Sequence, residues 1–132
     1  IEIQIKKLDE LYNEIEDLQA IKIDVEGMEI DVLKGSERII TNSLPVIGLE
    51  QLEEEFKEEF TETAALDWLR ERGFKIFTLK MSETHWFVRR IKDLLSIFDG
   101  GKLTREIIEY EKLPKGSYGM IYAVHKTLID NQ

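Results

Sequence analysis

The sequence predicts an α/β fold in which parallel strands are joined by helices. Residues 20–25 (AIKIDV) alternate apolar and polar side chains, the period-two pattern of a strand with one apolar face. Apolar residues then recur at helical spacing over 28–41, with Gly35 inside the expected helix. A second short apolar run, PVIGLEQ, follows at 45–51. Because a helix joins the two apolar runs, we expect them to pair as parallel strands.

Acidic side chains stand where both expected strands end. Asp24 closes the first strand, Glu26 and Gly27 form the turn into the helix, and Glu50 lies near the end of the second strand. In open α/β sheets, ligands bind in the crevice outside the carboxyl ends of the strands. We therefore expect Asp24, Glu26 and Glu50 to line one rim of the sheet.

Two carboxylates within one turn allow two interpretations. Close like charges raise one pKa and create a general base, or together hold a cation. Alternatively, Asp24 accepts backbone N–H groups in the loop while Glu26 favours the helix N-terminus. Lys22 shares the strand face of Asp24, so its ammonium either pairs with that carboxylate or extends from a stem packed along the sheet.

These residues also carry a family resemblance. IKIDVEGMEIDVLKGSERII, followed by LPVIGLEQ, resembles the FkbM-type family of S-adenosylmethionine-dependent methyltransferases, in which a Lys-Ile-Asp-Val-Glu-Gly segment opens the second half of the catalytic domain. The upstream LDELYNEI resembles the family's short helix before that strand. The resemblance is specific from Leu8 to about Gln51 and weaker to His125. It implies a single domain over 1–132, a partial doubly wound, Rossmann-like sheet, and a terminal antiparallel strand pair interrupted by a helical insert at 80–115.

The resemblance also implies an activity. Such enzymes move a methyl group from S-adenosylmethionine to an oxygen acceptor, which needs a hydroxyl held in line with the methyl carbon and a carboxylate to orient or deprotonate it. It assigns Asp24, Glu26 and Lys22 to catalysis, and Asp24 with Gly27 to the cofactor. The family binds its cofactor through a glycine-rich turn after the first strand, and no such turn precedes Asp24. We therefore expect a C-terminal fragment that is inactive alone.

The remaining segments follow from local pattern. Residues 52–60 read as a solvated acidic helix or loop. The other expected elements are a half-exposed strand at 1–5, a helix at 9–17, a helix capped by Thr61 or Thr63 and closed by Gly73, a strand at 74–79, helical stripes at 91–98 and from Leu103 to Tyr110, and a final strand at 120–126.

The insert holds the remaining candidate substrate residues. His85 and Trp86 lie in an irregular loop and, with Glu50, are predicted to contact the substrate, although a lone histidine is more often a surface residue. The insert itself is a substrate lid, a subunit contact or a decoration. Two isolated histidines without carboxylate spacing predict no metal site.

Composition limits the partners. With 27 acidic and 18 basic residues, the net charge of −9 disfavours nucleic acid and anionic membranes. The sequence has no cysteine and no apolar run near the ~20 residues that a spanning helix needs, which favours the cytoplasm. We expect self-association through the free edge of the strand at 20–25 or through the insert, unless residues 1–5 cover that edge. The alternative function is a non-catalytic acidic interaction module.

Overall fold

The computed structural model describes residues 4–12, 17–56, 62–81 and 105–130. The chain divides into two compact units, one formed by 1–78 with 109–132 and the other by 79–108. The strands are β1 (Ala20–Ile23), β2 (Val46–Gln51), β3 (Phe74–Met81), β4 (Arg105–Tyr110) and β5 (Tyr118–His125). The described helices are α1 (Leu8–Leu11), α2 (Glu29–Gly35), α3 (Glu37–Ser43), the 3₁₀ helix η1 (Glu53–Glu55), α4 (Ala64–Glu71) and α6 (Lys126–Ile129).

The strands form one sheet in the order β1-β2-β5-β3-β4. β1 and β2 run parallel, as expected for two strands joined by helices. β5 lies between β2 and β3 and is antiparallel to both. The sequence-based expectation of an α/β sheet with parallel strands and a terminal antiparallel pair is therefore confirmed.

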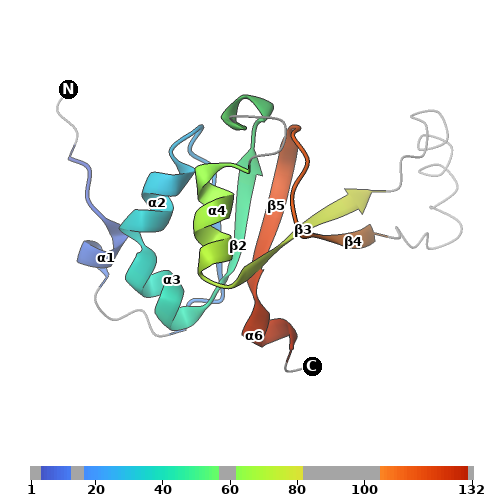
Figure 1. Cartoon of the computed structure of the whole chain (residues 1–132). Helices are drawn as coiled ribbons and strands as arrows, with labels where there is room; N and C mark the ends of the chain where they lie inside the picture. The colour runs from blue at the N-terminus through green and yellow to red at the C-terminus, as the bar shows by residue number, and fades with distance from the viewer. Residues whose placement is uncertain (1–3, 13–16, 57–61, 82–104, 131–132) are drawn as a thin grey trace, which may run out of the picture. The chain divides into compact units, whose positions relative to one another are not determined.

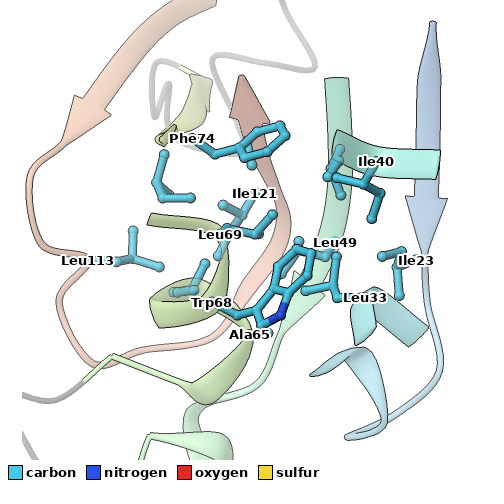
Figure 2. Packing of buried hydrophobic residues seen from close by; sticks show 14 of the residues in the cluster. Ile23, Leu33, Ile40, Leu49, Ala65, Trp68, Leu69, Phe74, Leu113 and Ile121 are labelled. Atoms are coloured by element: carbon cyan, nitrogen blue, oxygen red, sulfur yellow. The ribbon is translucent and has the colours of Figure 1, made fainter. Parts of the chain in front are cut away.

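The register of the strands separates an apolar face from a polar one. One row across the sheet joins Ile23, Leu49 and Ile121, all of which are buried. The neighbouring row joins Lys22 to Gly48, and its side chains lie on the opposite face. Helices α2, α3 and α4 lie against the apolar face (Figure 1). The core between them and the sheet, drawn in Figure 2, includes Ile23, Leu33, Ile40, Leu49, Ala65, Trp68, Leu69, Phe74, Leu113 and Ile121.

The single helix expected over 28–41 is two helices, because the chain breaks at Ser36. The Ser36 hydroxyl donates to the carbonyl of Val32 at 2.6 Å, a local bond that competes with helix continuation. Gly35 ends α2, and a Cβ added there would lie 3.8 Å from the Cα of Lys7. A side chain at Gly35 would therefore meet only ordinary van der Waals contacts.

The N-terminal segment caps the second of these helices. The Asp9 carboxylate accepts the backbone N–H groups of Arg38 at 2.8 Å and Ile39 at 3.1 Å. The Arg38 guanidinium returns hydrogen bonds to the carbonyls of Asp9 and Tyr12. Asp9 thus satisfies N–H groups that the start of α3 leaves without helical partners, although it lies about 30 residues away in sequence.

Two N-terminal expectations need correction. The strand expected at 1–5 is wrong for Gln4 and Ile5, which have no regular structure, and Ile5 is 87% exposed. Of the helix expected over 9–17, the described residues contain α1, which ends at Leu11. Residues 1–3 and 13–16 lie outside the described part of the chain. Isolated short helices are only marginally stable, so α1 depends on its contacts with α3.

The predicted signals at both ends of α4 are confirmed. Thr63 is its N-cap and accepts the N–H of Leu66 at 3.5 Å. Gly73, with φ of +85°, turns the chain into β3, and its N–H donates to the carbonyl of Arg70. Glycine tolerates this left-handed conformation without a Cβ penalty.

A buried ion pair joins α4 to the chain before β5. The Arg70 guanidinium donates to both carboxylate oxygens of Glu62, whose side chain is 3% exposed. Glu62 also accepts the N–H of Leu113 at 2.6 Å, and Arg70 donates to the carbonyl of Tyr110 at 2.9 Å. The buried charge is therefore paired and hydrogen-bonded, as burial requires.

The helix expected from Leu103 is wrong for the residues that the structure describes there. Arg105–Tyr110 is the strand β4, whose β-branched pair Ile107 and Ile108 suits a strand. The described part of the second unit holds the end of β3 and the start of β4. The helical stripe expected at 91–98 lies outside the described residues. None of the described helices is long and apolar enough to cross a membrane.

Candidate functional site

The acidic rim lies where β1 and β2 end side by side. Ile23 pairs with Leu49 in the parallel register, so the next residues along the two strands are Asp24 and Glu50. Because parallel strands end at the same edge of a sheet, the two carboxylates belong to one rim. The predicted placement of Asp24 and Glu50 on a common rim is therefore confirmed.

A tight turn follows Asp24. Glu26 has φ of +47° and Gly27 has φ of +93°, so two successive residues adopt left-handed conformations. For a residue with a side chain, this conformation costs roughly 1–2 kcal/mol. The Gly27 N–H donates to the carboxylate of Glu29 at 3.2 Å, and Glu29 is only 5% exposed. The turn is thus held by a buried carboxylate at the start of α2.

Lys22 and Asp24 form an ion pair on the polar face of β1. The ammonium lies 2.7 Å from the carboxylate, and both side chains are about half exposed, at 61% and 47%. The hydrogen bond to Asp24 and the charge of that carboxylate raise the pKa of Lys22, and the charge of Glu50 adds to the effect. Of the two interpretations of Lys22, pairing with Asp24 is confirmed.

Glu55, from η1, completes the rim. Its carboxylate oxygen lies 3.9 Å from the position that a Cβ on Gly27 would take. Burial raises the pKa of Glu55, and the charges of Glu29, Glu54 and Glu50 raise it further, while the hydrogen bond from the Leu52 N–H opposes this shift. Carboxylates from β2, α2 and η1 itself therefore act on Glu55 at this rim.

Sequence reasoning missed Glu29 and Glu55 as members of this rim. In the sequence, Glu29 stands in the first turn of a helix, where a negative charge needs no further explanation, and Glu55 lies in the acidic run at 52–60. The interpretation of 52–60 as solvated is wrong for Phe56, which is 4% exposed and belongs to the core. A large apolar residue directly after the glutamates was the available signal that this segment returns to the sheet.

The rim's charge determines which ligands it suits. Among the described residues of this rim, carboxylates such as Asp24 and Glu50 outnumber the ammonium group of Lys22. The net negative charge of the rim attracts cationic groups and repels phosphates. Its carboxylates can accept a proton or orient a hydroxyl. Among residues 4–12, 17–56, 62–81 and 105–130, no group of three or more His, Cys, Asp or Glu side chains has metal-binding geometry.

The other predicted site residues are placed as follows. His85 and Trp86 lie outside the described residues, so their assignment to substrate binding stays a prediction. The catalytic assignments of Lys22, Asp24 and Glu26 also stay predictions. His125 ends β5, as expected for a strand-end side chain, and its Nδ1 caps α6 by accepting the N–H of Thr127 at 3.4 Å.

Comparison with known proteins gives one match. The model of the Methyltransferase FkbM domain matches residues 1–76, which include the N-terminal segment, β1, the acidic turn, β2, α4 and the start of β3. No curated protein and no solved structure matches the chain. Because the family match covers more than half of the 132 residues, the chain belongs to the FkbM methyltransferase domain family.

Proposed function

We propose that this chain is part of a methyltransferase that moves the methyl group of S-adenosylmethionine to a hydroxyl of a small molecule or sugar. One observation carries the proposal: the segment that matches the family places its acidic turn at the carboxyl end of two parallel strands. Ligands of open α/β sheets bind at this end. We further infer that the sheet is one part of a doubly wound, Rossmann-like sheet.

The rim residues would then have separate roles. Asp24 accepts or orients the proton of the acceptor hydroxyl, because its half-exposed carboxylate stands at the strand end. Lys22 holds Asp24 in position through their 2.7 Å ion pair. Glu26, which the left-handed turn presents next to Gly27, is the second candidate base. Glu50 contributes negative charge where the acceptor binds. His85 and Trp86 are predicted to contact the same acceptor.

The described residues fit the cofactor only in part. S-adenosylmethionine carries a sulfonium cation, which suits a rim where carboxylates outnumber cations. The sequence has no glycine before Gly27, however, so it offers no glycine-rich turn ahead of β1. We infer that cofactor binding needs a glycine-rich segment in addition to these residues. The cytoplasm is the expected compartment for this cysteine-free sequence.

Calorimetric titration with S-adenosylmethionine tests the proposal in two steps. The 132-residue chain alone is expected to show no binding at millimolar cofactor. Joined to the cofactor-binding part of an FkbM methyltransferase, the chain is expected to bind at micromolar strength. In that complemented enzyme, Asp24→Asn should lower kcat by about 10²-fold or more, the usual scale for losing a general base.

Asp67→Asn is the matched control, because Asp67 is an exposed carboxylate on α4. It should leave turnover unchanged. If the complemented protein folds but binds no cofactor, the methyltransferase proposal is wrong and the interaction module becomes the better interpretation. If it binds and Asp24→Asn retains full turnover, the base lies elsewhere. Micromolar binding by the chain alone would contradict the inferred need for an additional segment.

A further inference from the structure

A β-bulge lies at the rim, where β2 ends and β5 begins. The register between the two strands shifts there, so that one residue of β2, Glu50, stands opposite two residues of β5, Gly119 and Met120. Because β5 is antiparallel to β2, its start lies at the same edge of the sheet as the ends of β1 and β2 (Figure 1). Bulges are frequent next to active sites, where they redirect side chains. The bulge therefore adds two residues of β5 to the acidic rim.

The two bulge residues differ in the space around them. The Met120 thioether lies over Gly48, since a Cβ added to Gly48 would come within 3.1 Å of its Sδ. A Cβ added to Gly119, by contrast, would meet no heavy atom of the described residues within 4 Å. The φ of Gly119 also lies outside the left-handed region that favours glycine. Neither conformation nor packing explains this glycine, and its lack of a side chain leaves open space opposite Glu50.

Glu50 places a charge beside this space. It is half-buried at the end of β2, and in the part of the chain that the structure describes its carboxylate has neither a hydrogen bond nor an ion pair. The neighbouring ammonium group, that of Lys22, binds Asp24 at 2.7 Å. A partly buried carboxylate is stabilised by a partner that supplies a positive charge or a hydrogen-bond donor. An ammonium or hydroxyl group of a ligand meets this requirement, whereas an anionic group does not.

We propose that the open space at Gly119, beside Glu50, binds the methyl acceptor, and that this acceptor is a small hydroxyl compound with an ammonium group, such as an amino sugar. The proposal rests on the methyltransferase function proposed above. The ammonium group pairs with Glu50, and the hydroxyl reaches Asp24 at the end of β1, since neighbouring strands are roughly 4.8 Å apart. The Met120 thioether contacts the carbon skeleton. An anionic acceptor would instead meet a rim of carboxylates.

Three related sugars of different charge test the proposal, and because β2 and β5 both belong to this chain, no cofactor is needed. The chain labelled with ¹⁵N-glycine gives one amide signal for each of its 8 glycines in nuclear magnetic resonance spectra. Glucosamine, added below neutral pH, should shift the signals of Gly119 and Gly48 but not that of Gly73, which lies at the other end of β5. Neutral glucose should bind at least about tenfold more weakly, because a charged hydrogen bond is replaced by a neutral one. Anionic glucuronate should leave these signals unchanged.

Two variants locate the binding. Glu50→Gln keeps the size of the side chain and removes its charge, so glucosamine should bind about tenfold more weakly and no better than glucose. Glu71→Gln, the matched control at an exposed position on α4, should bind as the unaltered chain does. Gly119→Val fills the open space and should abolish the glucosamine-induced shift at Gly48. Urea unfolding of this variant should show no loss of stability, since valine suits a strand and the added Cβ has room.

Several results would overturn the acceptor proposal: no shift at Gly119 with glucosamine, an equal shift with glucuronate, or unchanged glucosamine binding by Glu50→Gln or by Gly119→Val. None of these measurements involves S-adenosylmethionine. If glucosamine binds as expected but the complemented enzyme binds no cofactor, the methyltransferase proposal fails and the binding site remains. If the complemented enzyme binds the cofactor but the chain binds no glucosamine, the acceptor proposal alone is wrong.

Discussion

Two groups of carboxylates in this protein differ in what surrounds them. Glu62 is buried, contacts the Arg70 guanidinium with both oxygens and accepts the N–H of Leu113. At the acidic rim, by contrast, Glu55 lies near Glu29, Glu50 and Glu54, and the half-exposed Asp24 pairs with Lys22.

The difference separates a carboxylate that stabilises the fold from carboxylates that a ligand can reach. A buried carboxylate with its full set of partners stabilises the fold, and removing one partner leaves an uncompensated charge. At the rim, burial and the neighbouring carboxylates raise the pKa of Glu55, and the half-exposed carboxylate of Asp24 remains accessible to a ligand. Substitutions in the two groups should therefore change the free energy of unfolding by different amounts. Replacing Glu62 should lower it, whereas replacing Glu55 should raise it.

Removing Glu62 should have the largest effect. Glu62→Ala leaves the partly buried Arg70 guanidinium without its carboxylate and the Leu113 N–H without this acceptor. We expect the free energy of unfolding in urea to fall by about 3–5 kcal/mol, the range for breaking a buried pair. Glu71→Gln, at an exposed position on the same helix, should change it by less than about 0.5 kcal/mol. Equal effects of the two variants would show that the Glu62 pair is not structural.

The turn of the acidic rim should be sensitive to backbone conformation. Gly27→Ala places a Cβ on a residue with φ of +93°, although its nearest contact would be an ordinary 3.9 Å. We expect a loss of roughly 1–2 kcal/mol from conformation alone. Gly35→Ala is the matched control, because that residue is helical and its added Cβ also has room, so it should gain about 0.5–1 kcal/mol. A stabilising Gly27→Ala would contradict the left-handed turn.

Asp9 is a paired carboxylate at the surface, and its removal should have a smaller effect. Asp9→Ala leaves the N–H groups of Arg38 and Ile39 without their acceptor. The expected loss is about 1 kcal/mol, typical of removing a helix cap, and is measured by thermal or urea unfolding. Asp9→Asn keeps one acceptor oxygen and should lose less. If both variants match the unaltered chain, the N-terminal segment does not cap α3 in solution.

Glu55→Gln should have the smallest effect and the opposite sign. Because the pKa of Glu55 is raised above 4.5 in the folded chain, the folded state binds its proton more readily than the unfolded state. The ionised carboxylate therefore lowers stability as the pH rises through the window just above 4.5. The variant should gain at most about 0.5 kcal/mol at neutral pH. This gain should disappear below pH 4.5, as urea unfolding at both pH values would show.

Asp67→Asn controls for the loss of one negative charge, since Asp67 is exposed on α4. If Glu55→Gln and Asp67→Asn raise the free energy of unfolding equally, or if the gain persists in acid, burial and the neighbouring carboxylates do not raise the pKa of Glu55.

The sequence predicted the elements whose pattern is local. The alternation at 20–25 and the run at 45–51 predicted β1 and β2, and Thr63 and Gly73 marked the ends of α4. Apolar spacing alone failed in two places. The local hydrogen bond from Ser36 to Val32 divides a helix that the spacing predicts to be continuous. Arg105–Tyr110 is a strand of the sheet although its spacing also fits a helix.

By itself, therefore, the sequence determined the two parallel strands, the acidic turn between β1 and α2, and the family, because side-chain period and turn residues act over a few positions. Only the tertiary structure decided that Glu29 and Glu55 join the rim, that Asp9 caps α3, and that β5 lies between β2 and β3. Most of these contacts join residues far apart in the chain, and all depend on burial and hydrogen-bond partners that local pattern does not contain.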